Sequence, residues 1–222
     1  MYVIMGNPHG ISELKEITLD PIANYRNKVK VVLIDDENFA YAEILHNHGY
    51  LVTKKNDIDD IQSLEAYDII FCDINGIGLK LNSKLQGAYV ISEIRKKYPF
   101  KYIIAYSGRT QDLSLNHYFK MADQIIKKDA DSSEWVEVLD NATQKVLSPH
   151  SQWLKMRKTF FQREVPLVDI LRLEDRFVAA ILKKNPEMFV SQKSIVHLSA
   201  ETQQILKDFA FQVIKKLLLG II

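Results

Sequence analysis

The sequence predicts an α/β protein, with a doubly wound, three-layer (βα)5 domain built on a parallel sheet and an all-helical region after it. Between residues 28 and 147, short apolar segments alternate with segments of helical periodicity. Three of the apolar segments have unbroken cores of Val, Ile, Leu and Phe, which is typical of parallel strands buried on both faces. Glycine, which disfavours helices, is absent between Gly108 and Gly220, so the second part of the chain is predicted to be helical.

Five segments predict strands, and two of the segments between them have a clear apolar face at helical spacing. The predicted strands are KVKVVLID (28–35), YLVTKK (50–55), DIIFCDI (68–74), KYIIAYS (101–107) and QIIKK (124–128). The helix predicted over 87–98 places Ile91 and Ile94 on one face, and the helix over 132–147 does the same with Trp135 and Leu139. A further helix is expected to begin after the second strand, near Asn56 and Asp57.

The chain after Pro149 predicts three helices. Trp153 and Phe160 share a face of the first, Pro166 precedes the second, and Ser199 precedes the last. We therefore expect an N-terminal arm (1–27), an α/β domain (28–149) and a C-terminal helical region (150–222). A region of that size makes a marginal core alone, so its apolar faces are expected to pack partly against another surface or a second subunit.

Composition excludes several classes of protein. The chain has 222 residues, of which 47% are hydrophobic and 26% charged, as in ordinary globular proteins. The N-terminal sequence MYVIMGNPHG lacks the pattern of a secretory signal, and no apolar stretch approaches the roughly 18 residues that span a bilayer. A single cysteine, Cys72, excludes an internal disulfide framework. These features predict a cytoplasmic protein without membrane insertion.

Charge is distributed unevenly along the chain. Residues 28–149 contain 15 Lys and Arg against 18 Asp and Glu, a net charge of −3. Residues 150–222 contain 12 against 7, a net charge of +5. The asymmetry indicates two regions with different roles, but the basic excess is too small to require nucleic-acid binding.

Polar residues stand where the predicted strands end. In a doubly wound sheet the ligand site lies beyond the carboxyl ends of the strands. Two adjacent like charges repel each other unless a cation holds them, so the acidic pair after the first strand indicates a metal ion. The residues expected to converge at this edge are Asp35, Asp36, Asp73, Ser107 and, at the fifth strand, Lys127 with Lys128.

These residue types suit phosphoryl transfer assisted by Mg²⁺. The ion takes oxygen ligands, which Asp36 and Asp73 could supply together with the backbone carbonyl of Asn75. Asp35 would assist directly or through water. A carboxylate beside such an ion can attack phosphorus and form an acyl phosphate. In this interpretation Asp73 is the nucleophile, Lys127 the cation that meets the phosphoryl charge and Ser107 the hydroxyl donor.

The arrangement resembles the receiver domain of bacterial two-component response regulators, which has a flavodoxin/CheY-like fold. In that family an acidic pair follows the first strand, the phosphoaccepting Asp ends the third, a Ser or Thr ends the fourth and a Lys ends the fifth. The motifs VVLIDDE, DIIFCDI, IIAYSG and ADQIIKK fill all five positions in order, within about residues 28–147. The resemblance implies that Mg²⁺ is required and that a sensor histidine kinase or a phosphotransfer protein donates the phosphoryl group. It implies no enzymatic activity beyond self-phosphotransfer and autodephosphorylation.

The sequence departs from this family at three points. The segment after Asp73, INGIGLKLNSKLQG (74–87), is longer than usual and lacks proline. Gln124 occupies the place of the family's switch aromatic, three residues before the lysine. Lys128 stands where a proline usually follows that lysine, but alternation along QIIKK favours Lys127 as the residue that faces the site.

The output of such a switch is left open by the sequence. Protein contact, or a homodimer through the C-terminal helices, is the first hypothesis. A DNA-binding transcriptional regulator is an alternative, although a helix-turn-helix needs shorter helices and a tight turn that often contains glycine. A receiver-like interaction module that works without phosphorylation is another. An aspartate-based phosphohydrolase would want a second Asp two residues after a nucleophilic Asp35, where this chain has Glu37.

Overall fold

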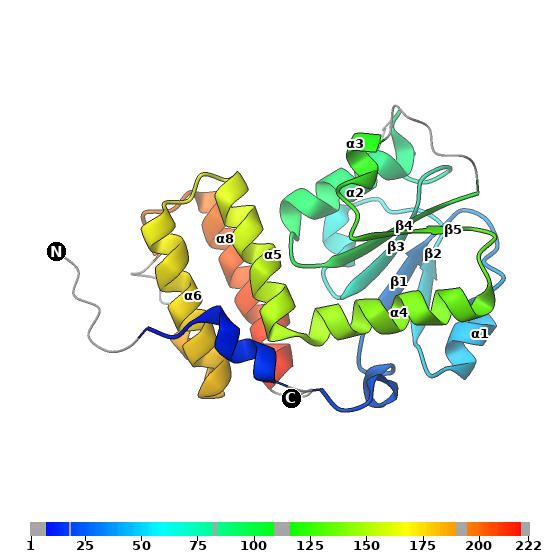
Figure 1. Ribbon diagram of the computed structural model, residues 1–222. Helices are drawn as coiled ribbons and strands as arrows, with labels where there is room; N and C mark the ends of the chain where they lie inside the picture. The colour runs from blue at the N-terminus through cyan, green and yellow to red at the C-terminus, as the bar shows by residue number, and fades with distance from the viewer. Residues whose placement is uncertain (1–7, 18, 82–83, 109–115, 190–194, 219–222) are drawn as a thin grey trace. The chain divides into compact units, whose positions relative to one another are not determined.

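The computed structural model describes residues 8–17, 19–81, 84–108, 116–189 and 195–218. The chain forms two compact units (Figure 1), which are described separately below. One unit comprises residues 20–146, and the other comprises residues 1–19 together with 147–222. The segment predicted as an N-terminal arm, 1–27, is therefore divided between the two units.

The α/β unit is built on a parallel sheet. Within the described residues the sheet has five strands: β1 (Val31–Ile34), β2 (Val52–Lys55), β3 (Ile69–Asp73), β4 (Tyr102–Ser107) and β5 (Gln124–Lys127). Their order is β2-β1-β3-β4-β5, and every pair is parallel. Each strand lies inside the segment that the sequence predicted. The strand order is that of a doubly wound sheet, which confirms the predicted fold class.

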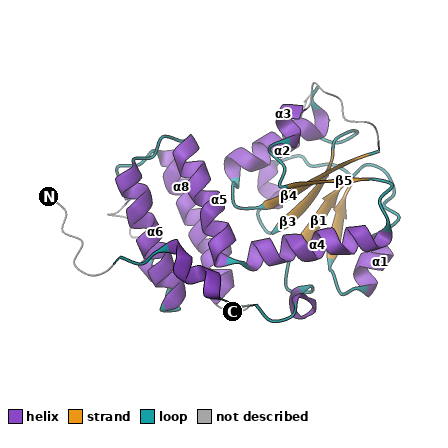
Figure 2. Ribbon diagram, in the orientation of Figure 1, coloured by secondary structure: helices purple, strands orange, loops and turns teal. Residues whose placement is uncertain are grey.

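Helices cover both faces of this sheet. The α-helices are α1 (Ala42–Asn47), α2 (Gln86–Lys97), α3 (Asn116–Phe119) and α4 (Ser132–Leu147), and the 3₁₀ helices are η2 (Ile22–Tyr25) and η3 (Ile61–Leu64). Figure 2 shows α2 and α3 on one face and α4 on the other. The helix expected near Asn56 is absent among the described residues: Asp57 accepts the amides of Ile58 and Gly78, so the chain forms a loop that ends in η3.

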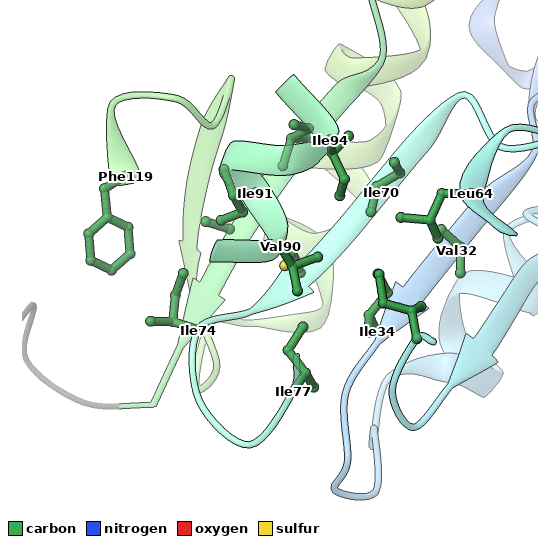
Figure 3. Packing of buried hydrophobic residues seen from close by; sticks show 14 residues of the cluster. Val32, Ile34, Leu64, Ile70, Ile74, Ile77, Val90, Ile91, Ile94 and Phe119 are labelled. Atoms are coloured by element: carbon green, nitrogen blue, oxygen red, sulfur yellow. The ribbon is translucent and has the colours of Figure 1, made fainter. Parts of the chain in front are cut away.

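One face of the sheet carries an aliphatic core (Figure 3), in which side chains of η3, α2 and α3 meet residues of β1, β3 and β4. Its fully buried members include Val32, Ile70, Ile91, Ile94 and Ile103. Gly87 allows α2 to begin against the end of β3, because a Cβ there would lie 1.8 Å from the carbonyl oxygen of Asp73. The first turn of α2 is thus fixed beside the carboxyl edge of the sheet.

The other face carries an aromatic core. Trp135 of α4 lies 5.4 Å from the ring of Phe71 and 5.7 Å from that of Tyr106, measured between centroids. Neighbouring residues of a strand point to opposite faces, and directly paired residues of parallel strands share a face. Since Asp73 pairs with Tyr106, and Tyr106 with Ile126, these three side chains lie on the aromatic face.

An ion-pair network ties η2 to this layer. The guanidinium of Arg26 donates to both carboxylate oxygens of Asp140, at 2.9 and 2.7 Å. The hydroxyl of Tyr50 donates to the same carboxylate. Burial, followed by the bond to Asp140, raises the pKa of Tyr50 well above its usual range. The network joins the residues before β1 to α4.

The helical unit has an aromatic core of its own. Its elements among the described residues are η1 (Ile11–Glu16), α5 (Pro149–Gln162), α6 (Leu167–Leu182), η5 (Pro186–Met188), α8 (Ala200–Phe209) and the π-helical turn η6 (Ala210–Ile214). The three predicted helices are α5, α6 and α8, and Ser199 caps α8 by accepting the amide of Thr202. Buried rings from Trp153, Phe160, Phe177, Phe189 and Phe209 fill the centre.

The start of the chain contributes to this second core. Leu14 of η1 is buried, η1 contacts α5 and α6, and the amide of His9 donates to Asp175 at 2.8 Å. The helical region therefore has more core than residues 150–222 alone would give it.

In the described part of the chain, no helix combines the length and the apolar character that crossing a membrane requires.

Candidate functional site

Three carboxylates meet at the carboxyl edge of the sheet. Asp35 and Asp36 follow β1, Asp73 ends the neighbouring β3, and one oxygen of each lies within 4.8 Å of the others. Asp35 and Asp73 are buried, whereas Asp36 is exposed. Hard carboxylate oxygens with one side open to solvent fit Mg²⁺, which keeps several of its waters when bound. The structure thus brings together the three acids that the sequence selected.

A lysine neutralises part of this cluster, but it is Lys128. Its Nζ lies 2.6 Å from Asp73 Oδ2, 3.1 Å from Glu37 Oε2 and 3.6 Å from Asp35 Oδ2. Lys127, which the sequence analysis placed at the site, is exposed. The prediction that Lys127 faces the acids is wrong.

The reason is the alternation of side chains along β5. Ile125 is 43% exposed and Ile126 is buried, so the inward residues are the even-numbered ones. Lys128 follows Ile126 by two and therefore lies on the face of Asp73.

Burial and charge set the protonation of the pair. Burial raises the pKa of Asp73 above its usual value, and the bonds from Lys128 and from the amide of Asn75 oppose this rise. Burial also lowers the pKa of Lys128, but its bonds to Asp73 and Glu37 outweigh burial and raise the pKa well above its usual range. The ammonium of Lys128 is therefore held charged beside a carboxylate that is poorly solvated.

The loop after β3 closes one side of the site. The amide of Asn75 donates to Asp73 Oδ1 at 3.2 Å, while its carbonyl as a metal ligand stays a prediction. Gly76 has a φ of +78°, and a Cβ there would lie 2.1 Å from Asp36 Oδ1, so its backbone rests on that carboxylate. A side chain at this position would displace Asp36 or the loop.

Two side chains hold this loop in place. Gln86 accepts the amide of Gly76 at 2.8 Å. Asp57, from the loop after β2, accepts the amides of Gly78 and Lys80 at 2.6 and 3.2 Å. The unusually long segment between β3 and α2 is thus an ordered wall of the site in its described parts.

Sequence reasoning missed Tyr106, which stands directly before Ser107. Its hydroxyl donates to Asp35 Oδ2 at 2.7 Å, and Asp35 Oδ1 accepts the amide of Glu37 at 2.8 Å. Burial, then the contact with Asp35, raises the pKa of Tyr106 far above its usual range, so it remains a donor. Its pairing with Asp73 across β3 and β4 is a feature of the sheet register, which no local pattern in the sequence shows.

Ser107 is the last residue of β4, and its backbone pairs with Lys127. The position of its hydroxyl lies outside what the structure describes. Its role as a hydroxyl donor to the phosphoryl group therefore stays a prediction.

Comparison with known proteins gives likenesses of fold. No protein-family model matches the chain, and no curated protein matches its sequence. A CheY-like response regulator receiver domain protein from Methanospirillum hungatei JF-1 is 16% identical, with a TM-score of 0.45, over 53% of this chain and 94% of that one. The receiver domain of NtrX from Brucella abortus is 22% identical, with a TM-score of 0.44, over 51% and 98% of the two chains. A response regulator from Thermotoga maritima is 17% identical, with a TM-score of 0.44, over 52% and 98%.

Proposed function

We propose that residues 28–149 are the receiver domain of a two-component response regulator and that Asp73 accepts the phosphoryl group. The observation that carries this proposal is the 2.6 Å contact between Asp73 and Lys128 beside two further carboxylates. A buried acid nucleophile, a fixed ammonium and oxygen ligands for a hard cation are the groups that phosphoryl transfer to a carboxylate needs. The proposal makes the chain a signalling module whose chemistry is confined to its own phosphorylation and dephosphorylation.

The transfer proposed here is a displacement at phosphorus. A carboxylate oxygen of Asp73 forms a bond to phosphorus while the bond from phosphorus to the donor breaks, and the donor leaves with that electron pair. Lys128 supplies positive charge to the phosphoryl oxygens, and Ser107 supplies a hydroxyl donor. Water later hydrolyses the acyl phosphate and returns Asp73 to its free form.

The acidic residues give Mg²⁺ a place in this scheme. Asp36 and Asp73 would hold the ion, with Asp35 assisting directly or through water and the carbonyl of Asn75 completing the protein ligands. When bound, the ion offsets the repulsion among the carboxylates and adds positive charge next to the phosphoryl group.

We propose that the phosphoryl donor is a sensor histidine kinase or a phosphotransfer protein in the cytoplasm, and that the helical unit carries the output. α5 and α6 are 14 and 16 residues long, which favours a protein contact over a compact helix-turn-helix. Exposed apolar side chains on these helices suit contact with a partner or a homodimer. They are Leu154, Phe161, Leu167, Val168, Leu171 and Leu182.

The first experiment tests the chemistry. The full chain is incubated with acetyl phosphate and Mg²⁺, and its intact mass is followed with and without EDTA. The proposal predicts a gain of one phosphoryl group that requires the ion. Asp36→Asn should weaken Mg²⁺ binding at least about tenfold by calorimetry. Unchanged affinity in that variant, or no mass gain in the native chain, would contradict the proposal.

The second experiment tests the output. Light scattering and hydrogen exchange of the full chain are compared with and without acetyl phosphate. The proposal predicts a change in mass, or in the exchange of α5, α6 or α8, that depends on labelling. Salt-sensitive binding to duplex DNA in place of these changes would favour the transcriptional alternative.

A further inference from the structure

We propose that Tyr106 is a positioning residue: its hydroxyl holds Asp35 so that Lys128 stays with Asp73. This inference rests on the proposed phosphoryl transfer. The hydroxyl lies 2.7 Å from Asp35 Oδ2, and the exposed fractions of Tyr106 and Asp35 are 0% and 2%. The contact is therefore shielded from water. A hydrogen bond to a charged group is stronger in such a buried environment than in solvent.

The ring of Tyr106 fixes where its hydroxyl can be. Tyr106 sits in the middle of the aromatic face, with ring centroids of Phe71, Phe39 and Trp135 at 6.4, 6.5 and 5.7 Å. Packed on these sides, the ring has little freedom, and its oxygen keeps one position at the edge of the sheet. The amide of Glu37 holds the other oxygen of Asp35, so both ends of this carboxylate are restrained.

Asp35 and Asp73 compete for one ammonium. Lys128 Nζ lies 3.6 Å from Asp35 Oδ2 and 2.6 Å from Asp73 Oδ2. The tyrosine hydroxyl binds the same Asp35 oxygen that faces the lysine. A buried carboxylate that loses a donor seeks another one, because leaving it unsatisfied is costly. Without the hydroxyl, Asp35 would draw Lys128 away from the nucleophile.

The Tyr106 ring also contacts the lysine. Lys128 Nζ lies 5.5 Å from the ring centroid, within reach of a cation–π interaction. Tyr106→Phe keeps this contact and the packing, and removes the hydroxyl alone. The matched control is Tyr102→Phe: Tyr102 lies on the same strand, and its hydroxyl is 3.4 Å from Gln124 Oε1.

The test compares rates of labelling by acetyl phosphate at saturating Mg²⁺. Losing one hydrogen bond to a charged group predicts labelling roughly tenfold slower in Tyr106→Phe, and a rate within about twofold of the native chain in Tyr102→Phe. A Tyr106→Phe rate equal to the native rate overturns this inference and leaves the receiver function standing. A native chain that takes no label overturns the proposed function and this inference together.

Measuring the effect of Tyr106→Phe a second time, in a chain that also carries Asp35→Asn, distinguishes positioning from simple loss of stability. Asp35→Asn keeps the shape of the side chain but removes the charge that competes for Lys128. If Tyr106 acts through that charge, Tyr106→Phe should slow labelling by less than about twofold in the Asp35→Asn background. An equal slowing in both backgrounds would mean that the hydroxyl serves the fold alone, and would overturn the inference. Hydrogen exchange of β4 peptides checks that each variant is folded.

Discussion

Replacing Lys128 by alanine removes one ammonium from three carboxylates. Its Nζ contacts Asp73, Glu37 and Asp35 at 2.6, 3.1 and 3.6 Å. The side chains of Asp73 and Asp35 are 2% and 3% exposed, so water cannot replace the lost charge. The variant leaves two buried acids next to each other without a cation when Mg²⁺ is absent.

The magnitude follows from this burial. Breaking a fully buried ion pair by removing one partner costs about 3–5 kcal/mol. Lys128 is 25% exposed, and its contact with the 72% exposed Glu37 contributes little. We therefore expect Lys128→Ala to lower the unfolding free energy of the metal-free α/β unit by about 2–3 kcal/mol. Lys127→Ala, at an exposed position, should change it by less than about 0.5 kcal/mol.

Native-state hydrogen exchange in EDTA measures this difference on peptides from β3 and β4, and peptides from the helical unit serve as an internal reference. Added Mg²⁺ should recover part of the loss in Lys128→Ala, because the ion binds the same carboxylates. Equal losses in the two variants, or a larger loss in Lys127→Ala, would refute the assignment of Lys128 to the site.

Three further predictions concern the loop beside the site and the ion-pair network of Asp140. Gly76→Ala should weaken Mg²⁺ binding at least about tenfold by calorimetry, because its methyl group would collide with Asp36. Gly49→Ala is the control. Gly49 has a φ of +91°, and a Cβ there would have its nearest neighbour at 3.8 Å, so the substitution adds backbone strain alone and should leave the Mg²⁺ affinity unchanged. Asp57→Ala frees the loop amides that its carboxylate holds, so their hydrogen exchange should be at least about tenfold faster, and unchanged exchange would count against an ordered loop. Asp140→Asn weakens the bonds from an arginine and a tyrosine and should lower the unfolding free energy by about 2 kcal/mol; a loss below about 0.5 kcal/mol would argue against that network.

The fold could be predicted because its signals are periodic. Unbroken apolar segments such as VVLI and IIFC mark strands that are buried on both faces, and they end at the residues that carry charge. Once the strands are parallel, their carboxyl ends must meet at one edge. Convergence of Asp35, Asp36 and Asp73 therefore followed from the sequence without knowledge of any distance.

Lys128 and Tyr106 could not be assigned in the same way. QIIKK contains two adjacent apolar residues and two adjacent lysines, so the alternation from which Lys127 was predicted fits an inward-facing Lys128 equally well. That choice is made by the neighbouring strand, where Tyr106 pairs with Ile126. Tyr106 itself looked like one more strand residue, because its importance lies in a hydrogen bond to a residue 71 positions away.

The backbone path of the loop between β3 and α2 could not be predicted from the sequence either. Its length and lack of proline were visible, but the close approach of Gly76 to Asp36 depends on a backbone path set by Gln86 and Asp57. Contacts of this kind join segments far apart in the chain, and no local pattern encodes them.

The proposed receiver chemistry depends on Asp73 as the phosphoryl acceptor. Intact-mass measurement after incubation with acetyl phosphate and Mg²⁺ tests it most directly, on Asp73→Asn and on the matched control Asp59→Asn, an acid of the neighbouring loop whose side chain is 80% exposed. We expect Asp73→Asn to gain no phosphoryl group and Asp59→Asn to be labelled like the native chain, because an exposed ion pair contributes little. Labelling of Asp73→Asn at the native level would contradict it.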